Sequence, residues 1–338
     1  MATQLNLCII YPIHITFCSR YILKRIQTCL SNTTQGLPQA EHLIALSGNA
    51  HYIKQAKTLI KALNQANINV VDYTPTSKPY SPGIARNFAV QHSKKANLLF
   101  WDIDLLGSPR LFEAIPKHIQ SIKKQTNRFE MYPCLYLCQK YTRGLQCQSQ
   151  QDFAKIWLDV ENLKANSIEH LALATSTILC DKQHFLNIGA FDDTFIGHMG
   201  EDLELLNRLV IAYEKHEIDE EYLLDSPSKN PSLLKGFRKH FAQHSTPHLR
   251  GEKFSLHLHH STRLFSKYKN NNNIHLLHEK MAEDLAAITN KKHTKSEYSL
   301  GKELYLNKAP TLNKNILERI KKKSLKLLRD PTQFFRDM

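Results

Sequence analysis

Short apolar runs and amphipathic stretches alternate along the N-terminal part of the chain, and this alternation constrains the fold more than any other feature. The apolar runs predict strands at residues 5–10, 41–46, 68–73 and from 98 onward. The stretches between them have apolar residues at helical spacing and predict helices over 19–30, 51–65 and 81–92. This pace indicates βαβ units on a mainly parallel sheet. We therefore predict an α/β fold, and 338 residues suffice for one large domain or two smaller ones.

Prolines mark two of the predicted element ends. Pro12 follows the first apolar run, and we expect the strand to end there because proline cannot donate to a sheet ladder. Ser81 and Pro82 suit the N-cap and first position of the third helix, which carries Arg86 and Asn87 one turn in. Arg86 and Asn87 suit hydrogen bonds to a nucleotide, or they form an exposed polar face.

The composition limits the classes of binding partner and the cellular compartment that we expect. Lys and Arg number 45 against 31 Asp and Glu, and the formal net charge of +14 suits an anionic partner: a nucleotide, a nucleic acid or an acidic lipid surface. The seven cysteines include no Cys-x-x-Cys pair, and we expect reduced thiols rather than disulfides or a zinc site. No basic residue precedes the first apolar run, and no run approaches the ~20 residues that span a bilayer. We expect a cytoplasmic protein without a signal peptide.

Two aspartates, Asp102 and Asp104, stand where the fourth predicted strand ends. Residues two apart in a strand point to the same face, so we expect the two carboxylates to converge. Ligands of open α/β sheets bind beyond the carboxyl ends of strands. A close carboxylate pair there suits Mg²⁺ or Mn²⁺ with substrate phosphate oxygens, and the alternative is a solvated turn. The chain has no glycine-rich phosphate loop, so a metal would handle the phosphate.

A second acidic pair, Glu201 and Asp202, follows Gly200 and opens a predicted helix. Acidic residues in a first turn complement the helix dipole, which gives a purely structural explanation. The same dipole favours the ionised carboxylate that a general base requires. The sequence leaves capping and catalysis both open.

Histidines cluster after a stretch without clear periodicity. Residues 216–254 are polar and contain three prolines, and we expect a long loop with little regular structure. If residues 256–260 form a strand, His257 and His259 share one face and His260 points to the other. Imidazole is a common ligand for manganese and other transition metals, although with 18 histidines in the chain the cluster can also be incidental.

The last stretch, residues 312–338, combines an apolar stripe with many lysines and arginines. It predicts a helix that either packs on the domain or docks on an anionic membrane surface or a partner protein. The positive charge gathers here rather than over the whole fold, and no nucleic-acid motif with interleaved basic and aromatic residues is visible. We therefore expect no nucleic-acid partner.

Four segments, in this order and spacing, resemble inverting GT-A glycosyltransferases of the bacterial capsule and polysaccharide synthase type. They are similar to chondroitin-polymerase and β-1,4-galactosyltransferase-like domains over roughly residues 5–280. The segments are Ser-Pro-Gly-Ile-Ala-Arg-Asn at 81–87, Trp-Asp-Ile-Asp at 101–104, the Ile-Gly-Ala-Phe-Asp to Gly-Glu-Asp-Leu-Glu-Leu stretch at 188–205, and His-His-Ser-Thr-Arg at 259–263. Residues 328–337 look like a segment that recurs in capsule-synthesis proteins, which hints that the chain is a fragment of something longer.

The resemblance implies a GT-A fold, a Rossmann-like mixed and mainly parallel sheet flanked by helices, with a basic C-terminal helical extension. It implies a UDP-sugar donor, a saccharide acceptor, a Mn²⁺ or Mg²⁺ cofactor and a role in capsule or surface-polysaccharide synthesis, in the cytoplasm or at the inner membrane. Two departures stand out. The first strand ends Tyr-Pro-Ile-His where the family usually has Pro-x-Tyr-Asn, and Ala190 replaces a glycine.

The resemblance also assigns roles to residues. Asp202 is the expected catalytic base and Glu201 its neighbour that holds the acceptor. The metal ligands are Asp104 with His260, or with His257 as the fallback. The residues expected to bind the nucleotide sugar are Pro12, Arg20, Arg86, Asn87, Asp102 and Asp104.

Three parts are expected along the chain: a nucleotide-sugar-binding half at 1–110, an acceptor-binding and catalytic half at 111–265, and a helical extension at 266–338. Two alternatives remain: a nucleotidyltransferase, which would release pyrophosphate instead of UDP, and a non-catalytic subunit or interaction module, which would hydrolyse no UDP-sugar.

Overall fold

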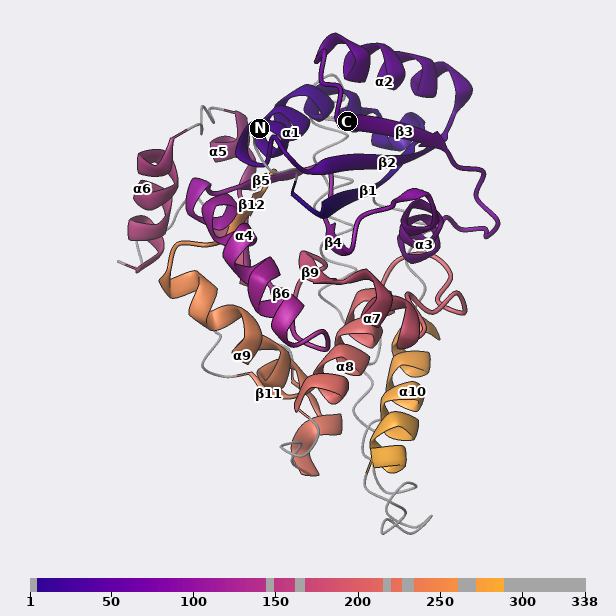
Figure 1. The fold of residues 1–338 in the computed structure, drawn as a ribbon, viewed down its shortest axis with the longest axis vertical. Helices are drawn as coiled ribbons and strands as arrows, with labels where there is room; N and C mark the ends of the chain where they lie inside the picture. Colours follow the sequence, from indigo (N-terminus) through magenta and orange to yellow (C-terminus); the bar gives the residue numbers. More distant parts are fainter. Residues whose placement is uncertain are drawn as a thin grey trace, which may run out of the picture.

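A computed structural model describes residues 5–143, 149–161, 168–214, 220–226, 234–260 and 272–288. These residues form a mixed α/β fold on two main sheets, with a small β10 (Asp225–Ser226) and β11 (Lys235–Gly236) ribbon (Figure 1). The larger sheet has the order β3-β2-β1-β4-β9-β6. Its strands are β1 (Leu7–Ile15), β2 (Glu41–Gly48), β3 (Ile68–Asp72), β4 (Asn97–Phe100), β6 (Phe129–Met131) and β9 (Ile178–Asp181).

The predicted parallel sheet is confirmed for β1 to β4, and β9 and β6 then add antiparallel pairs. Alternate side chains of β1 enter opposite cores: Leu7 and Ile9 face one, Cys8 and Ile10 the other. The first core is covered by η1 (Phe17–Ile22), α1 (Leu23–Gly36), α2 (Ala50–Ala62) and α4 (Pro109–Lys124). The second is covered by α3 (Pro82–His92), α7 (Lys182–Asn187) and α8 (Glu201–Glu214).

The smaller sheet has the order β5-β12-β7-β8, and its first strand follows β4 of the larger sheet along the chain. β4 belongs to the larger sheet and β5 to the smaller, so the chain changes sheets between Phe100 and Leu105. Both predicted aspartates lie in this crossing. The strands are β5 (Leu105–Gly107), β12 (Ser255–His257), β7 (Cys134–Leu137) and β8 (Ile168–Ala172), with α5 (Gln139–Arg143) and α6 (Gln150–Glu161) between β7 and β8.

Pro12 does not end the first strand, which continues to Ile15. Pairing of β1 with β4 stops at Ile10, whose carbonyl accepts from the Trp101 amide. Pro12 is two residues further on, so its missing N–H would point to the same side, where β4 has already ended. The prediction was wrong because the proline lies at a position of the ladder that needs no donor.

The loop expected over 216–254 is also wrong, because α9 (Phe237–Arg250) lies within it. The residues Phe237, Phe241, Ser245 and Leu249 recur every fourth position and are all buried. Histidines between them and a proline near the end of α9 hide this period in the sequence. A 3₁₀ turn, η2 (Glu220–Leu223), precedes the ribbon.

The last described helix, α10 (Asn272–Ile288), packs against α8 and belongs to the core, because Leu277 and Met281 are fully buried. Figure 1 shows the two helices side by side. The basic helix expected at 312–338 lies outside the described residues. Of the helices that the structure describes, none has the length and apolar character needed to cross a bilayer.

Candidate active site

A cavity of about 380 Å³ lies where the carboxyl ends of β1 and β4 meet the smaller sheet. This is the edge at which α/β sheets bind ligands. Its wall includes seven residues expected from the sequence: Pro12, Arg86, Asp102, Asp104, Asp202, His257 and His260. The structure therefore brings together residues from five separate segments of the chain.

Asp102 is held in place from two sides. Nη2 of Arg86 lies 2.7 Å from one carboxylate oxygen, and the Ser176 hydroxyl donates to the other at 2.9 Å. Burial alone would lower the pKa of the Arg86 guanidinium, but the carboxylates of Asp102, Glu201 and Asp202 outweigh it and raise that pKa. Arg86 is therefore a permanently charged group at the floor of the cavity, 3% exposed.

Asp104 faces two imidazoles. Its Oδ2 lies 3.4 Å from Nε2 of His257 and 3.5 Å from Nε2 of His260. Burial would raise the pKa of Asp104, but His257, His260 and Arg25 outweigh it and hold that pKa well below its ordinary value. Burial would likewise lower the pKa of His257, and Asp104 reverses the direction.

One carboxylate and two imidazoles, with ligand atoms all within 4.8 Å of one another, fit a divalent transition metal. Both His257 and His260 belong to this group, although a strand would place them on opposite faces, because β12 ends at His257 and His260 lies beyond the strand. His259 lies 3.6 Å from Glu169 instead. The two aspartates are not in a strand either: they share the cavity wall through a turn after β4.

Asp202 enters the cavity from the first turn of α8, after Gly200 at a φ of +92°. Burial raises the pKa of Asp202, and Arg86 opposes the shift. Burial and the neighbouring Asp202 also raise the pKa of Glu201. Glu201 does not line the cavity, and its Oε2 has no hydrogen-bond partner among the described residues.

The profile of the "Glycosyltransferase like family 2" matches residues 8–285 of the chain. The chain belongs to this glycosyltransferase family. The family implies a nucleotide-sugar donor and a saccharide acceptor, and its members commonly use a divalent metal. Every described residue of the cavity wall lies within the matched range.

Among solved structures, this glycosyltransferase is similar to TarS of S. aureus, with 14% identity, a TM-score of 0.37 and coverage of 60% of this chain and 33% of that one. A structure of TarS residues 1–349 gives 15% identity, a TM-score of 0.34 and coverage of 61% and 55%. The chain thus spans from a third to about half of the length of these chains. No curated protein matches it.

Arg25 is a site residue of this glycosyltransferase that the motifs do not reveal. It leaves α1, donates to the carbonyls of Leu258 and His259, and its Nη1 lies 3.7 Å from Oδ2 of Asp104. Arg25 therefore fixes the backbone between His257 and His260. The one signal in the sequence is its position three residues after Ile22, on the apolar side of the helix.

Aromatic rings hold the two imidazoles of the glycosyltransferase in orientation. Tyr136 stacks on His257 with ring centroids 4.3 Å apart, and Tyr21 stacks on His260 at 4.8 Å. These contacts fix the ring planes without using the nitrogens, which leaves both Nε2 atoms directed at Asp104.

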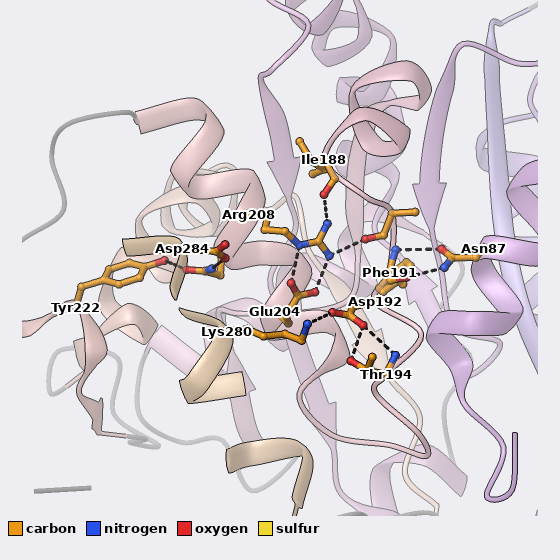
Figure 2. A network of polar contacts seen from close by, with 12 residues as sticks. Asn87, Ile188, Phe191, Asp192, Thr194, Glu204, Arg208, Tyr222, Lys280 and Asp284 are labelled. Atoms are coloured by element: carbon orange, nitrogen blue, oxygen red, sulfur yellow. Dashed lines mark hydrogen bonds and ion pairs between the residues drawn. The ribbon is translucent and has the colours of Figure 1, made fainter. Parts of the chain in front are cut away.

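Two of the expected donor-binding residues lie elsewhere. The amide of Asn87 donates to the Phe191 carbonyl at 2.7 Å and accepts from the Phe191 amide at 3.0 Å, so it ties α3 to the loop before α8 (Figure 2). Arg20 is exposed and lies over the Phe17 ring. Neither side chain lines the cavity.

A polar network fixes the loop that leads into α8 (Figure 2). Arg208 pairs with Glu204 and donates to the carbonyls of Ile188 and Ala190. From α10, Lys280 lies 2.5 Å from Asp192 in the same loop. The network therefore sets the position of the helix end that carries Asp202.

Proposed function

We propose that the protein transfers a sugar from a UDP-sugar to a hydroxyl of a saccharide acceptor, with inversion at the anomeric carbon and dependence on Mn²⁺ or Mg²⁺. One observation carries the proposal: the Asp104, His257 and His260 cluster and the carboxylate of Asp202 line the same cavity. The cluster can hold a metal-bound diphosphate, and Asp202 offers a base in the same cavity.

Asp104, His257 and His260 would hold the metal, and two imidazoles favour Mn²⁺ over Mg²⁺. When bound, the metal supplies Lewis-acid stabilisation of the negative charge that develops on the leaving UDP. Arg25 is positioned to keep the three ligands together. Asp102, oriented by Arg86 and Ser176, is assigned to the ribose or diphosphate of the donor, and Pro12 to the donor end of the wall.

Asp202 is assigned as the general base. It takes the proton of the acceptor hydroxyl while that oxygen bonds to the anomeric carbon and the bond to UDP breaks on the opposite face. We assign this role to Asp202 and not to Glu201 because only Asp202 lines the cavity. Glu201 keeps its proposed role of helping to hold the acceptor, as a buried neighbour whose own pKa is raised by burial and by Asp202.

We further propose that the protein acts in capsule or surface-polysaccharide synthesis. The division of the chain into three parts at 110 and 265, and docking through residues 312–338, are also proposals. A UDP-release assay with a panel of UDP-sugars, Mn²⁺ and saccharide acceptors tests the activity. Release of UDP with an acceptor supports it. Release of pyrophosphate favours a nucleotidyltransferase, and a folded protein that releases neither and binds no UDP-sugar indicates a non-catalytic module.

The pH dependence follows from the raised pKa of Asp202. The base must be ionised, so kcat/KM should fall about tenfold per pH unit on the acidic side of its apparent pKa. That apparent pKa should lie above the ordinary aspartate value of about 3.9. Because the pKa of Asp202 is higher in the folded than in the unfolded protein, ionisation of this carboxyl lowers the free energy of unfolding as pH rises, while activity increases over the same range. A pH–rate profile measures the apparent pKa, and one at or below the ordinary value would contradict the assignment of Asp202.

The Lys280–Asp192 pair should matter for rate rather than for donor binding. Lys280→Met frees the loop before α8, and a misplaced base is expected to lower kcat about 10- to 100-fold with little change in the KM for the donor. Lys239→Met, an exposed lysine on α9, is the matched control. Equal kinetics for the two variants would show that the pair does not position Asp202.

A further inference from the structure

Among the described residues, a second group of side chains outside the proposed active site has the composition of a metal site. His118 of α4, Glu130 of β6 and His248 of α9 each place a ligand atom within 4.8 Å of the others. Nε2 of His248 lies 2.9 Å from Oε2 of Glu130. Glu130 is 5% and His248 6% exposed, and none of the three lines the candidate active site.

Neighbouring groups orient two of these side chains in the manner of an outer coordination shell. The Tyr132 hydroxyl lies 2.7 Å from Nδ1 of His118, and Nε of Arg128 lies 2.8 Å from Oε1 of Glu130. Oε2 of Glu130 is thereby left facing His248. Metal-ligating histidines and carboxylates are usually fixed by such second hydrogen bonds.

We propose that His118, Glu130 and His248 bind a transition-metal ion, Zn²⁺, at a site separate from the donor cavity. Two imidazoles and a carboxylate are a common zinc ligand set, with water in the fourth position. The positive groups that face the site, Arg128 and Lys253, weaken its affinity for any cation, and the nitrogen ligands favour Zn²⁺ over Mg²⁺.

The site lies behind a wall of the active-site cavity. The Tyr132 amide donates to the Thr177 carbonyl at 3.0 Å, and the Thr175 hydroxyl donates to the Tyr132 carbonyl at 2.8 Å. Thr175 and Thr177 line the cavity, and Ser176 between them holds Asp102. An ion at this site would link α4 and α9 to β6 and brace that wall, so we expect Zn²⁺ to raise the melting temperature.

Bound zinc must be measured in a variant that lacks ligands of the proposed donor site, because the histidines of that site could also bind zinc. The full chain with Asp104→Asn and His260→Asn, stripped of metal by a chelator, is dialysed against Zn²⁺, and bound metal is measured by mass spectrometry. We expect about one Zn²⁺ per chain, with a rise in melting temperature. Adding His118→Asn should remove both the metal and the temperature rise, whereas adding the exposed His92→Asn should leave both unchanged.

Two results would overturn the site. One is a folded Asp104→Asn, His260→Asn protein that retains no zinc. The other is an equivalent of zinc that persists after His118→Asn or His248→Asn. Melting temperatures and circular dichroism in the absence of metal show whether each variant is folded. The zinc stoichiometry of the Asp104→Asn, His260→Asn protein is measured with the His118, Glu130 and His248 cluster intact. The readout is independent of glycosyl transfer, so it stands whether or not the proposed activity is found.

Discussion

Asp202→Asn should reduce the rate of sugar transfer by roughly 10²–10⁴-fold, the usual cost of removing a positioned general base. The amide has nearly the same shape but cannot accept the acceptor proton. Donor binding should be retained, because the residues assigned to the metal that holds the diphosphate are Asp104, His257 and His260, and Asp202 is not among them. Initial rates of UDP release, with UDP affinity measured in parallel, separate the two effects.

Asp193→Asn is the matched control for this variant. Asp193 is an exposed carboxylate in the loop before α8, and it does not line the cavity. We expect it to keep the rate of the unmodified protein. An Asp202→Asn protein with near-full activity would remove Asp202 from the chemistry and leave the acidic pair at the start of α8 as a capping feature.

Loss of the metal ligands should have an effect of similar size. His257→Asn removes one of two imidazoles at Asp104, and we expect transfer to fall about 10²-fold or more, because a Lewis acid contributes several kcal/mol to stabilising a leaving diphosphate. Chelation with EDTA should abolish transfer by the unmodified protein, and added Mn²⁺ should restore it. Partial recovery of His257→Asn at high Mn²⁺ would identify the defect as weakened metal binding.

The neighbouring histidine provides a control within the same segment. His259 lies against Glu169 rather than Asp104, so His259→Asn should keep the metal requirement and most of the activity. If EDTA leaves transfer intact, or if His257→Asn and His259→Asn behave alike, the Asp104 cluster is not a catalytic metal site.

The fold was largely accessible from the sequence because its first half consists of local patterns. Strands β1 to β4 and the helices between them each show their own hydrophobic period. α9 was missed because its buried face is interrupted by histidines and serine, and their burial depends on contacts with distant parts of the chain. The continuation of β1 past Pro12 depends on where β4 ends, which no local pattern records.

In the candidate site, as in the fold, residues in local motifs could be predicted and residues that depend on distant contacts could not. Asp102, Asp104 and Asp202 lie on the cavity as the motifs predict. The role of Arg25 depends on its contacts with the carbonyls of Leu258 and His259 just beyond β12, and the sequence alone does not show those contacts.

Asn87 illustrates the opposite error. Its place in a nucleotide-binding motif suggested a ligand contact, yet both ends of its amide bind the backbone of Phe191. A polar side chain in a motif can equally well fix the loop that carries the catalytic group, and only tertiary contacts distinguish the two.

Calorimetric titration of UDP into the metal-free protein, with and without Mn²⁺, tests the central claim most directly. We expect UDP to bind tightly only when Mn²⁺ is present, and Asp104→Asn to remove this metal-dependent gain in affinity. UDP that binds equally well in EDTA, or to Asp104→Asn as to the unmodified protein, would contradict the assignment of this cavity as a metal–diphosphate site.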